Sequence, residues 1–123
     1  MTSSTPPIDS SFTEPVFRCA AGPDGSRVIV TVDGDVDMAT APVLRQVLTD
    51  ALTTAEQAVL VDLARVQFMD SAGVHAVIDA QTTAYRRGLD LILHAPQRPV
   101  MRVFEVLRLT DLLHIAGDGS GPE

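Results

Sequence analysis

The sequence contains no lysine and no tryptophan, and only one tyrosine and one cysteine among its 123 residues. The single cysteine, Cys19, excludes an intramolecular disulfide and argues against a cysteine-based zinc site. We interpret it as a small hydrophobic residue near a strand. Since aromatic residues are also scarce, aliphatic side chains must build the core. The length suits one domain and leaves no room for a second.

Positive charge is also scarce, because nine arginines stand against sixteen acidic residues and give a net charge of −7. Such a chain repels nucleic-acid phosphates and anionic lipid, so neither a nucleic acid nor a membrane surface is expected as a direct partner. No signal-peptide pattern opens the sequence, and the longest apolar run, Ala58–Val61, is far too short to span a bilayer. These features predict a cytoplasmic protein.

The two ends differ in composition from the middle of the chain. Residues 1–14 are rich in Ser, Thr and Pro and are predicted to form a disordered tail. Residues 116–123 are small, acidic and glycine-rich, which predicts a flexible tail. The folded domain is therefore expected over residues 15–115.

Strand and helix patterns alternate within that domain. Runs of aliphatic and β-branched residues predict five strands, at Pro15–Ala20, Arg27–Asp33, Ala58–Leu63, Leu89–His94 and Leu112–Ile115. The turn formers Gly22–Gly25 predict a hairpin between the first two. Three amphipathic patterns predict helices. The first is capped by Thr40 and has Val43 and Val47 on its apolar face. The second runs from about Ala72 to Arg87 with Tyr85 on its apolar face, and the third is opened by Pro99.

This alternation indicates an α/β fold. Parallel strands separated by helices require crossover connections and a sheet covered by helices. We therefore expect a four- to five-stranded mixed sheet with the helices packed mainly on one face.

The most informative segment is the start of the second helix, where Asp70 and Ser71 precede an apolar periodic stretch. The unpaired backbone N–H groups of a helix start favour hydrogen-bond acceptors and negative charge. From the local sequence alone, these two residues are an ordinary N-cap pair, whose mutation to Ala would cost about 1 kcal/mol of stability.

A family resemblance adds a functional interpretation. The stretch Phe68–Val74 (FMDSAGV) resembles the signature of the anti-sigma factor antagonists (anti-anti-sigma factors) of the STAS family, in which the Ser of an Asp-Ser-(Ser/Thr/Ala)-Gly-(Leu/Val) segment is phosphorylated. Gly34–Leu44 (GDVDMATAPVL) resembles that family's Gly-Glu-(Leu/Ile)-Asp…(Thr/Ser)-Ala-x-x-Leu segment, and Val103–Thr110 resembles its third helix. The resemblance covers about 100 residues in order and implies a STAS-like fold.

Three features depart from the family pattern. Asp111 stands where the family usually has Gly, and His75 stands where many relatives have a small residue. The C-terminal tail is also short for the additional last helix that many members carry. Of the three, only His75 bears on the surface of the predicted site, where it is expected to influence partner choice.

The resemblance implies a phosphorylation switch. In this family the unphosphorylated protein binds an anti-sigma factor that is also a serine kinase, the sigma factor is released, and a serine phosphatase restores the binding form. Ser71 would be the phosphate acceptor, which implies that transcription is regulated through the charge at this position. The residues implied in partner binding and kinase presentation are Asp37, Asp70, Ala72, Gly73 and His75.

The expected effect of the phosphate is local. Phosphorylation adds about −1.5 to −2 charges to a surface that already holds Asp35, Asp37 and Asp70. It should weaken docking of a partner without unfolding the domain. Asp35 is interpreted as part of a solvated loop, whereas for Asp37 a loop role and a role in presenting the acceptor both stay open.

Two other functions fit parts of the sequence. A hydrolase would use Ser71 as nucleophile with His75 or His94 as base, but the Gly-x-Ser-x-Gly elbow is missing and His75 lies a helical turn away. No enzyme activity or cofactor is therefore expected, and the scattered His75, His94 and His114 do not predict a zinc site. The alternative within the fold is a non-switching STAS scaffold or a transporter-partner subunit.

Overall fold

Strands and helices alternate along residues 17–117, the part of the chain that the computed structural model describes. The elements are β1 (Arg18–Asp24), β2 (Arg27–Asp33), α1 (Ala41–Thr54), β3 (Ala58–Arg65), α2 (Ser71–Arg86), β4 (Asp90–His94), α3 (Arg98–Val106) and β5 (His114–Ala116). The strands form one sheet in the order β1-β2-β3-β4-β5, with β1 antiparallel to β2 and the remaining pairs parallel. The expected mixed α/β sheet is confirmed.

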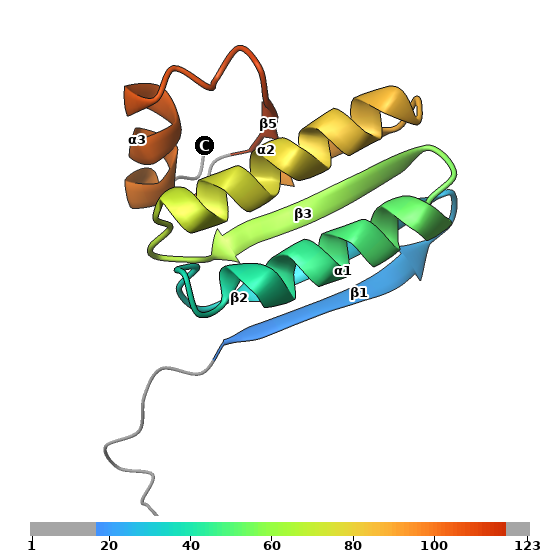
Figure 1. The fold of residues 1–123 in the computed structure, drawn as a ribbon. Coiled ribbons are helices and arrows are strands. Elements are labelled where there is room, and N and C mark those ends of the chain that lie inside the picture. Colours follow the sequence, from blue (N-terminus) through green and yellow to red (C-terminus); the bar gives the residue numbers. More distant parts are fainter. Residues whose placement is uncertain (1–16, 118–123) are drawn as a thin grey trace, which may run out of the picture.

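The connections explain why one face of the sheet is covered. Three β-α-β units step in the same direction across the sheet, and right-handed crossovers place the helices of such a series on one face. Figure 1 shows α1 and α2 side by side in front of the sheet, with α3 at its β5 end. The inward-facing strand residues are buried and aliphatic: Val28, Val30, Val32, Val59, Val61, Leu63, Leu91 and Leu93. On the opposite face, the residues between them are half-buried, apart from Thr31, which is exposed.

The first hairpin differs from the prediction. β1 continues through Gly22 and Pro23 to Asp24, and the turn consists of Gly25 and Ser26 alone. Gly25 takes a φ of +63°, which a residue with a side chain rarely adopts. The end of the strand is therefore set by its pairing with β2 and not by the presence of turn-forming residues. A proline fits an edge strand when its missing N–H faces away from the neighbouring strand. The predicted strand start at Pro15 lies outside the described residues.

Two apolar residues predicted to be internal lie on the surface. Tyr85 is 82 % exposed, although Val74 and Val77 of the same predicted face are buried together with Ala76, Ala80 and Ala84. Val43 on α1 is 47 % exposed, although Leu44, Leu48, Ala51 and Leu52 of its predicted face are buried. The apolar periodicity therefore located both helices and most of their buried faces, and was wrong for these two residues.

The C-terminal part of the domain extends slightly beyond the prediction. α3 begins at Arg98, one residue before Pro99, and β5 begins at His114 rather than at Leu112. Leu112 and Leu113 lie in a turn closed by their N–H groups on the Leu109 carbonyl, at 2.9 and 3.0 Å. β5 ends at Ala116, a residue that the sequence assigned to the tail. The predicted tails at residues 1–14 and 118–123 lie outside the described residues.

Cys19 lies in β1, where it is half-buried and packs against the core. Burial raises the pKa of its thiol to about 11. The thiol is therefore protonated and weakly nucleophilic at neutral pH, in keeping with its interpretation as a small hydrophobic residue.

Candidate functional site

Two loops at the carboxyl ends of β2 and β3 are joined by backbone hydrogen bonds. Val36 and Met69 form an isolated parallel bridge, in which Val36 N donates to Phe68 O at 2.9 Å and Asp70 N donates to Val36 O at 3.0 Å. Both bridging side chains are buried. The bridge therefore aligns Asp37 and Asp70, each of which directly follows a bridging residue.

Asp70 opens α2. Its backbone is extended, and its Oδ1 accepts hydrogen bonds from Ala72 N at 2.8 Å and Gly73 N at 3.3 Å. This is the N-cap role that the local sequence predicted. The carboxylate of Asp70 is therefore directed to the helix backbone, which limits what it can offer a partner.

Ser71 follows as the first residue of α2 and is exposed. Among the side-chain hydrogen bonds of residues 17–117, none involves its hydroxyl. The hydroxyl is thus available to solvent at the end of the helix where the macrodipole favours added negative charge.

Gly73 is buried against the bridge between the two loops. A Cβ at this position would lie 2.6 Å from Val36 Cγ1 and 2.7 Å from Met69 Cγ, far closer than real Cβ contacts. The glycine is required because the first turn of α2 packs directly on the other loop. Its place in the site is therefore structural, with no side chain to offer a partner.

The loop before α1 is held by two side chains. Asp37 Oδ1 accepts from Ala39 N at 2.9 Å and from Thr40 N at 3.1 Å. The Thr40 hydroxyl donates to the Asp35 carbonyl at 2.8 Å and accepts from Asp37 N at 2.9 Å. Thr40 is at the N-cap position but makes no side-chain cap bond to α1, so its predicted cap role is wrong: it braces the preceding loop.

His75 lies on the exposed surface of α2, one turn beyond Ser71. Residues four apart on a helix are neighbours, so both side chains belong to the same exposed stripe. Within the described chain no hydrogen bond joins His75 to Ser71. The nucleophile–base hydrogen bond that a hydrolase would use is therefore not formed between these two residues.

Two exposed apolar side chains beside the site were not singled out as contacts by the sequence. Met38 directly follows Asp37 and is 78 % exposed, and Phe68 precedes the bridge residue Met69 and is 49 % exposed. The available signal was a large apolar residue, Met38, directly after Asp37 in the loop before α1. Exposed apolar residues beside an exposed polar acceptor are typical of a protein-docking surface.

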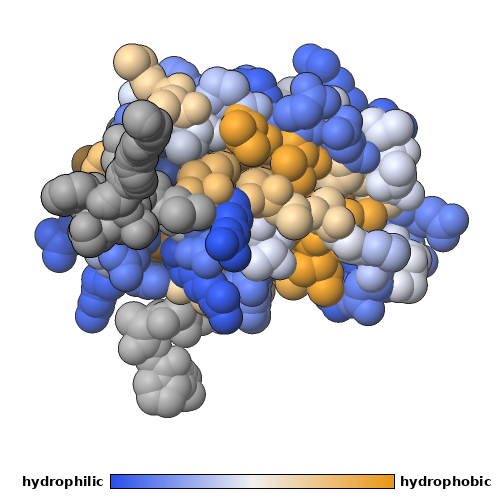
Figure 2. Space-filling view, turned by 90° about the horizontal axis from the view of Figure 1, so that it is seen from below, coloured by the Kyte–Doolittle hydropathy of each residue, from blue (hydrophilic) through white to orange (hydrophobic). Residues whose placement is uncertain are grey.

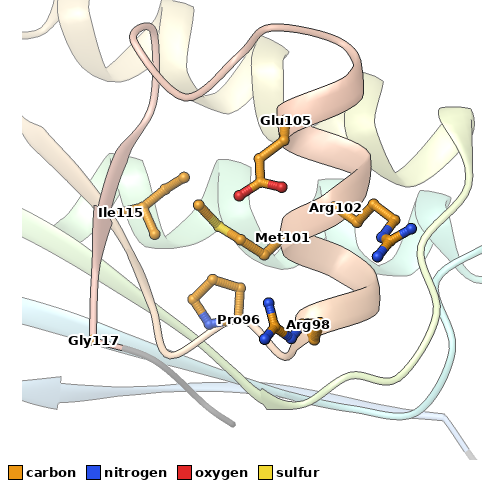
Figure 3. A pocket seen from close by; sticks show the side chains of 7 residues that line it. All are labelled: Pro96, Arg98, Met101, Arg102, Glu105, Ile115 and Gly117. Atoms are coloured by element: carbon orange, nitrogen blue, oxygen red, sulfur yellow. The ribbon is translucent and has the colours of Figure 1, made fainter. Parts of the chain in front are cut away.

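A separate hollow of about 260 Å³ lies between α3 and β5. Figure 3 shows Met101 and Ile115 facing one another across it, with the Glu105 carboxylate directed inward and Arg102 directed away. None of the predicted site residues lines this hollow. The candidate site is therefore the surface around Ser71 and not this cavity.

Over residues 17–117, no three His, Cys, Asp or Glu side chains gather closely enough to hold a metal ion. In the same range, no helix combines the length and the apolar character needed to cross a bilayer.

Comparisons with known proteins agree with this architecture. Residues 19–114 match the family described as "Mlab, STAS domain", so the sheet, its helices and the α2 start define a STAS domain. The anti-sigma-B factor antagonist of Listeria monocytogenes is 30 % identical over 93 residues, covering 75 % of this chain and 81 % of that protein. The Staphylococcus aureus anti-sigma-B factor antagonist is 29 % identical over 86 residues, covering 70 % and 80 %.

Solved structures share the fold. An anti-sigma factor antagonist from Mycobacterium paratuberculosis superposes with a TM-score of 0.67 at 21 % identity, covering 82 % of this chain and 86 % of that one. The unphosphorylated anti-sigma factor antagonist SpoIIAA gives 0.62 at 22 % identity, covering 81 % and 86 %. The chain belongs to the STAS-domain family of anti-sigma factor antagonists. The names of these relatives describe regulatory proteins rather than enzymes.

Proposed function

We propose that this protein regulates transcription by binding a serine-kinase anti-sigma factor in its unphosphorylated form, and that phosphorylation of Ser71 ends that binding. The observation that carries the proposal is the exposed hydroxyl of Ser71, which has no hydrogen-bond partner among residues 17–117, at the start of a helix that Asp70 already caps. A phosphate can be added there without removing a hydrogen bond that holds the fold. A serine phosphatase would restore the binding form.

The surroundings of Ser71 favour a charge-sensitive interface. Asp35 and Asp37 lie in the loop that the Val36–Met69 bridge ties to the α2 start. A phosphate of about −1.5 to −2 charges would join these carboxylates at the surface. A partner packed over the exposed Phe68 would then bury unpaired negative charge, which is costly.

The candidate residues divide into two roles under this proposal. Ser71, Ala72 and His75 belong to the α2 surface that the partner would contact, with His75 as the side chain that distinguishes this chain from many relatives. Asp37 and Asp70 present the acceptor by fixing the loops, since each carboxylate bonds backbone N–H groups. With these partners, the protein would act in the cytoplasm without direct contact to nucleic acid or membrane.

The relatives support this direction. The curated relatives are named as antagonists of an anti-sigma factor, and the fold neighbour SpoIIAA is known in both an unphosphorylated and a phosphorylated form. The alternative is a non-switching STAS scaffold or transporter-partner subunit. It is favoured by the family description "Mlab, STAS domain" and by a fold neighbour named as a sulfate transporter family protein.

The test is to incubate the full chain with each candidate serine-kinase anti-sigma factor of the same genome and ATP, and to locate the added phosphate by mass spectrometry. Ser26 is a matched control, because it is the other serine of the described chain and its hydroxyl donates to Gln57 Oε1 at 2.9 Å. We expect label on Ser71, none in Ser71→Ala, and unchanged label in Ser26→Ala.

Binding distinguishes the switch from the alternative. Isothermal titration should show that Ser71→Ala binds the kinase as tightly as the parent chain, whereas the phosphorylated chain and Ser71→Asp bind at least tenfold more weakly. Phosphate on another residue, or equal binding by the phosphorylated chain, would overturn the switch and leave the non-switching subunit.

A further inference from the structure

β1 is the edge strand of the sheet, and no strand within residues 17–117 pairs with its outer side. Its sequence from Arg18 to Asp24 is RCAAGPD, so the charged residues stand only at its two ends. The middle consists of small side chains. Edge strands of this length are normally interrupted by charges or covered, because their free backbone groups pair readily with another strand.

The hairpin fixes which backbone groups point outward. In an antiparallel pair, alternate residues direct their N–H and C=O groups to the partner strand. Asp24 and Arg27 close the two-residue turn and are paired in register. Asp24 and every second residue before it therefore direct their backbone groups to β2, and the residues between them direct theirs away from β2. The outward residues are Cys19, Ala21 and Pro23. The position of Pro23 agrees with this phase, since its missing N–H costs no bond to β2.

We propose that a second copy of this chain pairs with β1 in antiparallel orientation, about a two-fold axis at Ala21, and joins the two sheets into one. In this register Ala21 faces its own symmetry mate and exchanges two hydrogen bonds with it. Cys19 N–H donates to the carbonyl of Pro23 in the other copy, and the symmetric bond forms as well. The pairing is isologous, as expected of a homodimer.

The charges favour this occupant over an unrelated peptide. The same register places Arg18 of each copy opposite Asp24 of the other, so the strand is complementary to itself at both ends. Cross-strand pairs of opposite charge stabilise an antiparallel ladder, and like charges in the same places destabilise it. The complementarity is specific to one register, because a shift of two residues would bring neither pair together.

The helix beside β1 offers an apolar flank to the same partner. Arg45 on α1 pairs with Asp79 on α2, which marks the side of α1 that faces α2. Val43 and Val47 lie about 160° around the helix from Arg45, at about 100° per residue. They therefore lie on the side toward β1, with which α1 packs. Val43 is 47 % exposed and Val47 is half-buried.

The surface on this side of the molecule is consistent with a docking face. β1 and α1 are the lowest elements in Figure 1, and Figure 2 views the molecule from below. The view shows a hydrophobic band across the middle of this face, flanked by hydrophilic residues. At the other edge, β5 has only three residues, of which His114 is paired with Asp90. The sheet therefore has one long edge, at β1, and one short edge, at β5.

The first test is the mass of the full, unmodified chain in solution, measured by sedimentation equilibrium over a range of concentrations. We expect a reversible dimer. Arg18→Glu places two negative charges opposite one another, and Asp24→Arg two positive ones, so each variant alone should dissociate about tenfold more readily. An equimolar mixture of the two variants restores both opposite-charge pairs and should dimerise like the parent chain.

The rescue by mixing separates pairing from folding. Asp24 also bonds Arg27 within the hairpin, at 2.5 Å, so Asp24→Arg alone could act through its own strand. A merely structural effect would persist in the mixture. A parent chain that stays monomeric at all concentrations, or variants that dimerise as well alone as mixed, would overturn the proposal.

The second test fixes the register by cross-linking. In a Cys19→Ser background, Ala21→Cys places two thiols on residues that face one another with Cα atoms about 5.5 Å apart, within disulfide range. Oxidation should give a covalent dimer. The parent Cys19 is the matched control, because its two copies would be about 14 Å apart along the strands, at four residues of about 3.4 Å each. Equal cross-linking from Cys19, or from the exposed loop position in Ala39→Cys, would contradict the register.

Neither test involves the kinase or a phosphate. Failure of the dimer therefore leaves the proposed switch at Ser71 untouched, and failure of the switch leaves the dimer untouched.

Discussion

The helices that follow β2 and β3 begin in different ways, although their two starts are tied together by the Val36–Met69 bridge. Before α1, the hydroxyl of Thr40 is fully engaged, since it donates to one loop carbonyl and accepts from one loop N–H. At the start of α2, the cap is supplied by a carboxylate, and the hydroxyl of Ser71 lies outside it.

This difference shows how the fold separates holding the loops from presenting a reactive group. Asp37 and Thr40 shape the first loop from within, and the second loop needs only Asp70 for the same purpose. A hydroxyl that performs no structural task can be modified without loss of stability. The comparison therefore gives Thr40 a structural role and supports the proposal that Ser71 is the switch.

The largest expected effect breaks the contact between the two starts. Gly73→Ala would force a Cβ against Val36 and Met69, and overpacking of this kind costs about 1–3 kcal/mol. Urea denaturation should show this loss in the free energy of unfolding. Gly22→Ala is the matched control, because a Cβ there meets no atom within 4 Å. Equal losses at both glycines would show that Gly73 is not specially constrained.

The next effect removes the cap from α2. Asp70→Ala leaves two backbone N–H groups without their acceptor and should lower the free energy of unfolding by about 1 kcal/mol, within a range of about 0.5–2. Asp70→Asn retains a side-chain oxygen and should recover most of the loss. Comparison of the three chains by chemical denaturation checks this; an Ala variant as stable as the Asn variant would contradict the cap.

The order of elements could be predicted from the sequence because each is set by local features. β2 was placed from Arg27 to Asp33 as the structure has it, and the start of α1 follows from Pro42, since proline suits the first helical turn. Asp70 was correctly expected as a cap for the same reason: the residues it bonds are two and three positions away.

Features that depend on distant contacts could not be read in this way. The need for glycine at position 73 comes from Val36, which lies on another loop, and the bridge between Val36 and Met69 has no local signature. The exposure of Tyr85 likewise depends on which side of α2 packs inward. The sequence indicated a site at the start of α2, but only the structure shows that the Thr40 hydroxyl is hydrogen-bonded within its loop and that Ser71 is exposed.

The smallest expected effect tests the comparison of the hydroxyls directly. Thr40→Ala leaves the Asp35 carbonyl without a donor and the Asp37 N–H without an acceptor, which should cost about 1 kcal/mol. Ser71→Ala removes an exposed hydroxyl and should change stability by less than about 0.5 kcal/mol in either direction. Thr40→Ser keeps the hydroxyl and should lie between the parent chain and Thr40→Ala. Thermal and urea unfolding of the four chains would measure the order of their stabilities. If Ser71→Ala is as unstable as Thr40→Ala, the Ser71 hydroxyl also stabilises the fold. Its phosphorylation could then not act on docking alone.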